Sequence, residues 1–348
     1  MIPFTELKID AMLVSALPNV RYLSGFTGSN GLLLVTPEST TLFTDPRYTI
    51  RASEECSCKV KTVTKGHLEL AAIQTIARKK LKKIGFEASR TIFESYQRLK
   101  EALPLGVSLK PIGPVIERLR MVKNDKEIAQ IRESVRTNSK AFDATLRELK
   151  KGAKESEIAA ILEYKMRLFG AEKPAFETIV AAGDHSAMPH AQPSERKTGI
   201  DELLLIDMGS CQDGYMSDMT RTLFIGKPSP KVRKMYNAVL EAQLAAIDAV
   251  KPGVKAGHVD RQARKVLEAE GLGKSFVHST GHGLGLEIHE PPRIGRKEQA
   301  RLEAGMVITI EPGAYIRGFG GVRIEDTVLV TKTGCEILTP TSKELILL

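Results

Sequence analysis

The sequence predicts an α/β (α+β) protein of two domains, residues 1–120 and residues 121–348. Three observations support this prediction. A chain of 348 residues is long enough for two hydrophobic cores. Short strand-like runs alternate with helical runs in the first domain, whereas the second opens with long amphipathic helices. The second domain also contains two segments that align with each other without gaps.

The first domain is predicted to contain a mixed sheet covered by helices. Five short apolar or alternating runs predict strands, and three longer amphipathic runs predict helices. The strands are expected over 9–15, 31–36, 40–45, 59–63 and 83–87, and the helices near 46–55, 67–82 and 91–102. Residues 110–120 contain Pro111 and Pro114, so we interpret them as a linker into the second domain.

The second domain begins with two predicted helices. Asn124 or Asp125 is suited to cap the first helix, because their side-chain oxygens can accept from amide groups that have no partner within the helix. Glu127 then lies in the first turn, where a negative charge is favourable. A second amphipathic helix is expected after Gly152.

A repeat predicts internal symmetry in this domain. Residues 149–176 align without gaps with residues 250–277, at an offset of 101, and the two segments share glycines and lysines at matched positions. Each copy predicts a helix, a glycine, a strand and then a histidine-bearing segment, over 184–190 in the first copy and 281–289 in the second. A duplicated α/β unit should form a pseudo-two-fold domain with its site at the shared centre.

Composition restricts the class of protein. Charged residues make up 27% and hydrophobic residues 42%, as in ordinary soluble globular proteins. The sequence has no run of eighteen apolar residues, and its start lacks the pattern of a secretory signal. The four cysteines form no CxxC pair and are too few for a disulfide scaffold. We therefore expect a cytoplasmic protein without a membrane partner.

The net charge of +9 raises the question of a nucleic-acid partner. The densest basic run, residues 78–83, ends a predicted helix, where cations complement the helix dipole. The sequence contains no RNA- or DNA-binding motif and no tryptophan for base stacking. We interpret the run as a solvated helix face and expect no nucleic-acid partner.

Two aspartates flank a predicted hairpin. Asp207 ends one apolar run and Asp218 begins the next, and the dipeptide Asp213-Gly214 between them is a strong hairpin signal. A hairpin can bring the two carboxylates side by side, where they repel each other unless a cation neutralises them. Two turn-capping aspartates explain this pair, taken alone, equally well.

Three further residues complete a potential metal-binding set. His282 lies in the glycine-rich segment 280–285. A phosphate-binding loop would contain a GK[ST] motif and be followed by a helix, and this segment has neither the motif nor a helical pattern after it. Glu311 and Glu325 lie in or at the end of predicted strands, where a buried carboxylate needs a partner. Arg323 could pair with Glu325, whereas a metal would explain both glutamates. Four carboxylates and one imidazole can hold two divalent cations that polarise a water between them, which predicts a hydrolase.

The motifs around these residues resemble a known family. The segments IDMG, SDMTRT, STGHGLGLEIHE, ITIEPG and GVRIED resemble the pita-bread metallopeptidases of family M24, and among them the Xaa-Pro peptidases, aminopeptidase P and prolidase. The resemblance covers essentially the whole chain. It implies a creatinase-like N-terminal mixed-sheet domain over residues 1–120, followed by a pseudo-two-fold pita-bread catalytic domain over residues 121–348. It also implies a homodimer.

The resemblance implies a role for each metal ligand. Asp207 resembles the ligand of one metal, and Asp218 and Glu325 resemble the ligands that bridge both metals. His282 and Glu311 resemble the ligands of the other metal. Oxygen-rich ligands with one histidine favour Mn²⁺, with Co²⁺ or Zn²⁺ as alternatives.

Catalytic and substrate-binding residues also follow from the resemblance. Glu311 resembles the family's proton shuttle, His289 resembles the residue that stabilises the tetrahedral intermediate, and His190 resembles a histidine beside the substrate. We group these three as catalytic. The predicted substrate-binding residues, which include the apolar wall for a proline ring, are Phe176, Ile179, His190, Ile288, His289, Arg293 and Arg323.

The resemblance predicts hydrolysis of the bond before proline, a tertiary amide without an N–H group. We favour an aminopeptidase acting on short peptides with proline in the second position, with overlapping Xaa-Pro dipeptidase activity, because residues 26–31 resemble aminopeptidase P-like members. A strict Xaa-Pro dipeptidase is the alternative, because Arg293 lies where prolidases carry an arginine for the substrate carboxylate. A methionine aminopeptidase, or a binding module that has lost the chemistry, is a further alternative.

Overall fold

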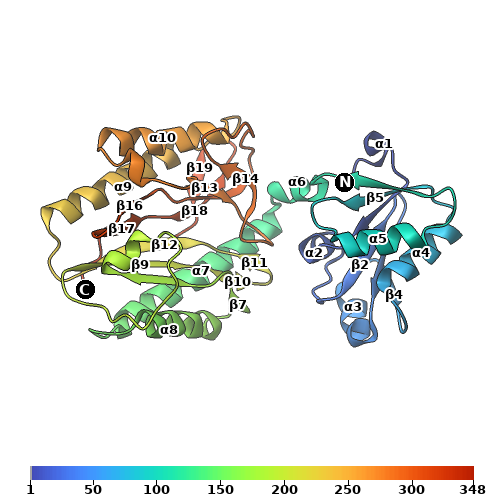
Figure 1. The fold of residues 1–348 in the computed structure, drawn as a ribbon, viewed down its shortest axis with the longest axis horizontal. Coiled ribbons are helices and arrows are strands. Elements are labelled where there is room, and N and C mark those ends of the chain that lie inside the picture. The colour runs from blue at the N-terminus through green and yellow to red at the C-terminus, as the bar shows by residue number, and fades with distance from the viewer. Residues whose placement is uncertain (1) are drawn as a thin grey trace. The chain divides into compact units, whose positions relative to one another are not determined.

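The computed structural model describes residues 2–348, which form two compact units that divide between Arg120 and Met121. Each unit combines helices with β-sheets (Figure 1), which confirms the α/β class. Among the described residues, no helix is both long enough and apolar enough to cross a membrane.

The first unit is built on a six-stranded sheet in the order β4-β3-β2-β1-β5-β6. β2 runs antiparallel to its neighbours β1 and β3, and the other neighbouring strands are parallel, so the sheet is mixed as predicted. The strands are β1 (Ala11–Val14), β2 (Gly31–Val35), β3 (Thr40–Thr44), β4 (Lys59–Thr62), β5 (Lys83–Glu87) and β6 (Ser108–Ile112). The first five confirm the predicted strands.

Helices cover both faces of this sheet. Along β1, Ala11 and Leu13 join the apolar cluster under α4 and α5, whereas Met12 and Val14 join the cluster under α2, α3 and α6. This alternation follows from the two-residue period of a strand. The helices are α1 (Phe4–Leu7), α2 (Leu17–Ser24), α3 (Thr49–Glu55), α4 (Leu68–Arg78), α5 (Phe93–Ala102) and α6 (Val115–Met121), with a short 3₁₀ turn η1 (Pro46–Tyr48) before α3.

The prediction of a linker over residues 110–120 is wrong, because these residues belong to β6 and α6. Pro111 is compatible with a strand here since β6 is at the edge of the sheet, where one side of the strand needs no donor. Pro114 directly precedes α6, a position at which proline does not interrupt a helix. The helices α1 and α2 have no predicted counterpart, because four and eight residues are too few to show a helical period.

The second unit contains sheets between two pairs of helices (Figure 1). α7 (Asp125–Glu148) and α8 (Glu155–Leu168) pack on the sheet β12-β9-β8, and α9 (Pro230–Asp248) and α10 (Ala256–Ala269) pack on the sheet β14-β13-β15-β18-β19. Two small sheets, β11-β10-β7 and β16-β17, complete the unit.

The bounds of the remaining elements are β7 (Lys173–Pro174), β8 (Ile179–Ala182), β9 (Glu202–Met208), β10 (Ser210–Gln212), β11 (Tyr215–Met216), β12 (Met219–Ile225), β13 (Gly281–Gly283), β14 (Glu290–Ile294), β15 (Val307–Ile310), β16 (Gly313–Ile316), β17 (Gly320–Arg323), β18 (Asp326–Val330), β19 (Cys335–Ile337), and the 3₁₀ turns η2 (Gly183–Ala187) and η3 (Gly273–Ser275).

The predicted cap of α7 is present. The side chain of Asn124 accepts from the backbone of Glu127, and the Glu127 carboxylate accepts from the backbone of Asn124.

The helices of the two aligned segments correspond, whereas the first segment continues into strand β7 and the second into the 3₁₀ turn η3. α8 and α10 contain 14 residues each, and they begin and end 101 residues apart. Lys154 and Lys255 immediately precede them and each forms an isolated β-bridge to a later residue. Gly152 and Gly253 have φ values of 74° and 85°, which a residue with a side chain rarely adopts. The offset in the sequence therefore corresponds to a repeated structural unit.

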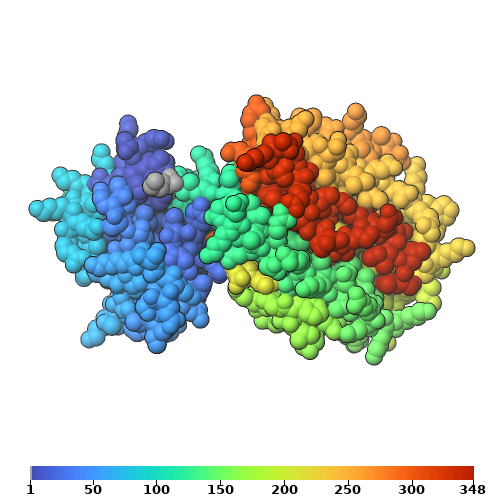
Figure 2. All heavy atoms as spheres, turned by 180° about the vertical axis from the view of Figure 1, so that it is seen from behind, coloured from blue at the N-terminus to red at the C-terminus, as the bar shows by residue number. Residues whose placement is uncertain are grey.

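A buried arginine holds the C-terminal segment against the second unit. Arg221 in β12 is 1% exposed and donates to Asp326 Oδ1 and to the carbonyl of Thr341, both at 2.7 Å. It also donates to the carbonyl of Ser342 at 2.8 Å. Figure 2 shows the C-terminal residues, in red, on the surface beside the green residues of α7, where Arg132 pairs with Glu336.

We expect Arg221→Met to lower the free energy of unfolding by about 3 kcal/mol, because the buried carboxylate of Asp326 would lose its arginine partner. Lys343 also pairs with Asp326, at 2.8 Å, and limits the loss. Urea denaturation would measure the effect. Arg233→Met, at an exposed position of α9, is the control and should change stability by less than about 0.5 kcal/mol. Equal stability of the two variants would contradict this role of Arg221.

Candidate active site

One cavity of the second unit is lined by all twelve residues predicted for the site. Its volume is about 880 Å³, within the range of small-molecule sites. Its walls come from the sheet β12-β9-β8, from the five-stranded sheet and from the segments that connect their strands. The predicted residues that line it are Phe176, Ile179, His190, Asp207, Asp218, His282, Ile288, His289, Arg293, Glu311, Arg323 and Glu325.

The strands β9 and β12 place the two aspartates. They pair antiparallel with Asp207 opposite Thr220, and Asp218 directly precedes β12. The turn between β10 and β11 contains Asp213 and Gly214, with φ values of 47° and 72°, as a two-residue hairpin turn of type I′ requires. The two carboxylates therefore face one cavity from neighbouring strands.

The five-stranded sheet and its connections contribute the other three potential ligands. His282 lies in β13, Glu311 directly follows β15, and Glu325 lies between β17 and β18. The backbone N–H of Glu311 donates to the carbonyl of Thr280 at 2.8 Å. The backbone N–H of Glu325 donates to the carbonyl of Thr220 in β12 at 3.1 Å, which joins the two sheets at this point. Carboxylates from both sheets thus reach one centre.

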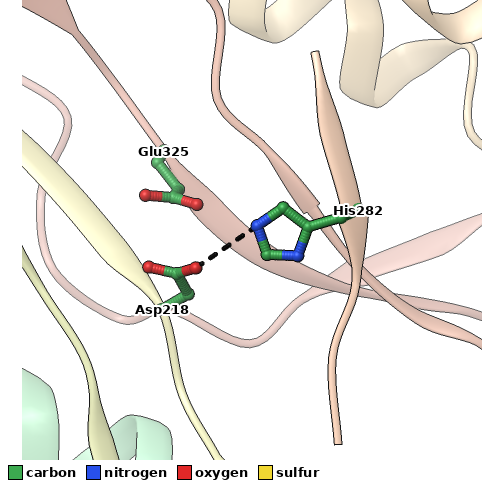
Figure 3. A group of neighbouring side chains, drawn as sticks. All are labelled: Asp218, His282 and Glu325. Carbon is green, nitrogen blue, oxygen red and sulfur yellow. Dashed lines mark ion pairs between the residues drawn. The ribbon is translucent and has the colours of Figure 1, made fainter. Parts of the chain in front are cut away.

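Asp218, His282 and Glu325 each direct one ligand atom toward a common point, with the three atoms within 4.8 Å of one another (Figure 3). His282 Nε2 lies 3.6 Å from Asp218 Oδ2 and 3.4 Å from Glu311 Oε1. The other ring nitrogen, Nδ1, lies 3.0 Å from the carbonyl oxygen of Gly283 and therefore donates to it. In the neutral ring, Nε2 then directs a lone pair toward carboxylate oxygens, and a cation between them would stabilise this arrangement.

Burial and mutual repulsion disfavour the charged carboxylates. Burial raises the pKa of Asp218 well above its usual value, and the charges of Glu325 and Asp207 raise it further. Burial, together with the charge of Glu311, also raises the pKa of Glu325 well above its usual value. The pKa of Glu311 is raised to about 7, mainly by burial. Burial lowers the pKa of His282, so its ring is neutral at pH 7. A divalent cation would reverse the penalty on the carboxylates and accept the neutral imidazole.

Two buried carboxylate oxygens, Asp207 Oδ1 and Glu325 Oε1, have no hydrogen-bond partner within residues 2–348. The second oxygen of each group is bound, because Arg323 donates to Asp207 Oδ2 and Thr220 donates to Glu325 Oε2, each at 2.7 Å. Buried polar atoms normally have partners. Two free carboxylate oxygens in a cavity that also contains a neutral imidazole nitrogen therefore fit a divalent-metal centre.

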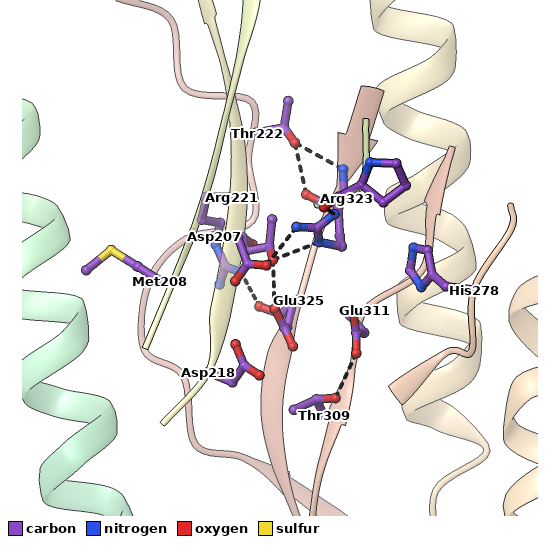
Figure 4. Close-up of polar contacts among 12 residues, drawn as sticks. Asp207, Met208, Asp218, Arg221, Thr222, His278, Thr309, Glu311, Arg323 and Glu325 are labelled. Atoms are coloured by element: carbon purple, nitrogen blue, oxygen red, sulfur yellow. Dashed lines mark hydrogen bonds and ion pairs between the residues drawn. The ribbon is translucent and has the colours of Figure 1, made fainter. Parts of the chain in front are cut away.

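The tertiary structure corrects one suggested pairing and adds two residues. Arg323 does not pair with Glu325 but points at Asp207 (Figure 4), and it also donates to the hydroxyl of Tyr315 at 2.6 Å. The Tyr315 hydroxyl lies 2.9 Å from His278 Nε2. His278 lines the cavity, and burial lowers its pKa to about 4. Its place four residues before His282 could have indicated it, whereas nothing in the sequence distinguishes Tyr315.

The remainder of the cavity wall combines apolar and basic side chains. Phe176, Ile179 and Ile288 provide apolar surface. The ring of His289 packs edge-on against that of His282, with 4.4 Å between their centroids. Arg293 in β14 lies directly opposite His282 in the pairing of β13 with β14, and it is exposed to solvent. The cavity can therefore receive an apolar ring and an anionic group close to the acidic centre.

Comparison with known proteins identifies the family of this chain. Residues 129–332 match the profile of metallopeptidase family M24, and residues 4–122 match that of the creatinase/prolidase N-terminal domain. The chain belongs to metallopeptidase family M24. This M24 metallopeptidase is therefore an enzyme that hydrolyses peptide bonds with divalent metal, and its second unit has the pita-bread fold.

Three named relatives match the M24 metallopeptidase over nearly its whole length. An Xaa-Pro dipeptidase of Pyrococcus horikoshii is 41% identical over 340 residues, which cover 97% of this chain and 95% of that protein. The solved structure of an Xaa-Pro dipeptidase from Bacillus anthracis is 37% identical, has a TM-score of 0.96 and covers 99% of this chain and 97% of its own. That of an X-Pro aminopeptidase from Thermotoga maritima is 36% identical, has a TM-score of 0.93 and covers 99% of each chain.

Proposed function

We propose that this M24 metallopeptidase is an Xaa-Pro dipeptidase, which hydrolyses the bond between the first residue and a C-terminal proline. The observation that supports this choice is Arg293, whose side chain lines the cleft that holds the acidic centre. An arginine there can bind the free carboxylate of a dipeptide in a bidentate manner. Relatives named Xaa-Pro dipeptidase agree with this proposal. The comparisons thus favour the alternative over the aminopeptidase that residues 26–31 suggested.

We assign two divalent cations to Asp207, Asp218, His282, Glu311 and Glu325. When bound, the cations supply Lewis-acid activation of the peptide carbonyl and of the attacking water. Mn²⁺ is the proposed ion, because four carboxylates and one imidazole form a predominantly oxygen ligand set. The two carboxylate oxygens without partners and the neutral ring of His282 support this assignment.

Glu311 is the proposed carrier of the proton. Its carboxylate lines the cleft and lies 3.4 Å from His282, and Thr309 Oγ1 donates to its Oε1 at 3.3 Å, which helps to fix its orientation. In this position it can take the proton from the attacking water and transfer it to the nitrogen of the leaving proline. That nitrogen has no hydrogen in the substrate and must gain one for the proline to leave.

The remaining cleft residues are proposed to bind and orient the substrate. Phe176, Ile179 and Ile288 form apolar surface for the proline ring. His289 and His190 are exposed residues of the cavity wall, where an imidazole N–H can stabilise the oxygen that becomes negative in the tetrahedral intermediate.

Arg293→Gln tests the choice of a dipeptide as substrate. We expect the KM for Ala-Pro to rise about 30- to 100-fold, because a charge-assisted contact to the substrate carboxylate contributes roughly 2–3 kcal/mol. The KM for Ala-Pro-Gly should change little, since its carboxylate lies one residue further on. Initial rates with Mn²⁺ would measure both. Arg296→Gln, an exposed arginine outside this cleft, is the control and should leave both values unchanged.

The same assay decides between the proposed function and its alternative. The unmodified protein should cleave Ala-Pro faster than Ala-Pro-Gly. Faster cleavage of Ala-Pro-Gly than of Ala-Pro, together with unchanged KM values for both peptides in Arg293→Gln, would favour an aminopeptidase. Cleavage of neither proline peptide would refute the proposed function.

A further inference from the structure

A buried ion pair lies beneath the loop that carries Ile288 and His289. Lys123 Nζ lies 3.3 Å from Glu290 Oε2, and each side chain is only 2% exposed. The two residues are 167 positions apart in the sequence. A buried ion pair adds little net stability compared with a well-packed apolar pair, but the loss of one partner is costly because it leaves an uncompensated buried charge. The position of the Glu290 carboxylate therefore depends on that of Lys123.

The loop over residues 284–289 is arranged around the carboxylate of Glu290. The backbone N–H of Glu287 donates to Glu290 Oε1 at 3.1 Å. Gly285 lies so close that a Cβ there would be 2.9 Å from Oε1 and 3.0 Å from Oε2. Both carboxylate oxygens therefore contact the turn of the loop, and a shift of this group would shift the backbone that leads to His289.

Lys123 holds this carboxylate relative to the strand that leads to a metal ligand. Its backbone N–H donates to the carbonyl of Gly305 at 2.9 Å, and its Nζ lies 3.3 Å from the carbonyl oxygen of Met121. The adjacent Val122 forms a β-bridge with Met306, which directly precedes β15. β15 in turn leads directly to Glu311. The ion pair thus connects the loop before Glu290 to the backbone that carries Glu311.

We propose that Lys123 and Glu290 are positioning residues that together hold His289 and Ile288 in place over the metal centre. This inference rests on the proposed function, which assigns these two side chains to the substrate. Lys123 does not line the cleft. Glu290 does line it, but its side chain is only 2% exposed and its carboxylate is bound to Lys123 and to the loop backbone. Since a misplacement of about 1 Å can lower a rate about 100-fold, the loss of the pair should affect catalysis as well as stability.

Lys123→Met tests the proposal, because it removes the ammonium group and keeps an unbranched side chain. At a temperature where the variant is fully folded, we expect kcat/KM for Ala-Pro to fall about 10- to 100-fold. Both kcat and KM should change, since His289 is assigned to the transition state and Ile288 to the proline ring. The number of bound Mn²⁺ ions should equal that of the unmodified protein. Lys126→Met, an exposed lysine three residues further on, should behave like the unmodified protein.

Hydrogen exchange provides a readout that needs neither substrate nor metal. We expect amide exchange of residues 284–290, measured by mass spectrometry, to be faster in Lys123→Met than in Lys126→Met. Because this measurement tests the loop alone, it separates the two hypotheses. An unmodified protein that cleaves no proline peptide would refute the proposed function, whereas unchanged exchange in Lys123→Met would refute the role of the ion pair.

Gly285→Ala tests the same contact from its other side without changing any charge. Its methyl group would displace the Glu290 carboxylate, so we expect the same direction of change in kcat/KM and in exchange. This variant also maintains the test if Lys123→Met does not fold. Combining Lys123→Met with Glu290→Gln should cost no more activity than Lys123→Met alone, because the two residues act as one unit. A lower melting temperature with unchanged kcat/KM and exchange would show a purely structural pair and overturn the proposal.

Discussion

Replacing Glu311 with glutamine is expected to lower kcat for Ala-Pro by at least about 1,000-fold while the protein remains folded. An amide cannot take and return a proton, and the loss of a general base alone typically lowers a rate by about 10²- to 10⁴-fold. The amide is also a weaker metal ligand than the carboxylate, so the effects on proton transfer and on metal binding act in the same direction. Steady-state kinetics with excess Mn²⁺ would measure the loss.

The same substitution should stabilise the metal-free protein at high pH. The pKa of Glu311 is raised to about 7, mainly by burial, so its ionised form is unfavourable in the folded state. Glutamine has a similar shape and no charge. The melting temperature of EDTA-treated Glu311→Gln should therefore exceed that of the unmodified protein at pH 8, and the difference should shrink toward pH 5. A gain in stability with a loss of activity is typical of a residue retained for function.

Glu303→Gln is the matched control, because Glu303 is exposed and lies ahead of β15. It should change neither kcat nor the melting temperature of the metal-free protein. A Glu311→Gln protein that retains more than a tenth of the original kcat would overturn the proposed role of Glu311 as proton carrier.

Removal of divalent metal should abolish turnover and make the stability of the protein decrease as the pH rises from about 5 to 8. The pKa values of Asp218, Glu311 and Glu325 are raised in the folded state. Between the unfolded and folded pKa values, the folded protein binds more protons than the unfolded chain, so a rise in pH favours unfolding. For Glu311 alone, the rise in pKa from 4.5 to about 7 corresponds to a loss of roughly 3 kcal/mol in the free energy of unfolding once the pH exceeds the folded pKa.

Mn²⁺ should reverse this dependence. A cation takes the place of the protons on the carboxylates, so it binds more tightly as the pH rises. The increase in melting temperature caused by saturating Mn²⁺ should therefore be larger at pH 8 than at pH 5.5. Thermal unfolding of EDTA-treated protein, with and without Mn²⁺ at both pH values, would measure it. Asp218→Asn should show a shallower pH dependence without metal. A metal-free protein whose stability rises over this range would contradict the metal centre.

Local patterns predicted most elements of the first unit. The strands β1 to β5 are short apolar or alternating runs, and such runs can be recognised from the sequence without knowledge of the strands that pair with them. The same local rules failed for residues 110–120. Pro111 and Pro114 there are as typical of an edge strand and of the residue before a helix as they are of a linker. Only the pairing of β6 with β5 distinguishes these possibilities.

The sequence also predicted which residues form the acidic centre, but not how they pair. The Asp213-Gly214 turn and the repeat predict that Asp207, Asp218 and His282 lie near one centre, and all three line the same cavity. Whether Arg323 would pair with Glu325 or with Asp207 could not be decided, because Arg323 lies two residues from one and 116 from the other. Proximity in the sequence favoured Glu325, and the packing of the two sheets brought Asp207 to the guanidinium.

The M24 family and the set of potential metal ligands can be recognised from the residue types, their order and the repeated unit. Such motifs and patterns can be read from the chain alone, because turn chemistry and apolar periods depend on residues that are close together in the sequence. Three other properties cannot be read from the sequence: which carboxylate oxygens lack a partner, the chain of hydrogen bonds from Asp207 through Arg323 and Tyr315 to His278, and the pairing of Lys123 with Glu290. Those properties depend on distance and burial, which arise when the two sheets pack together and water is excluded between them.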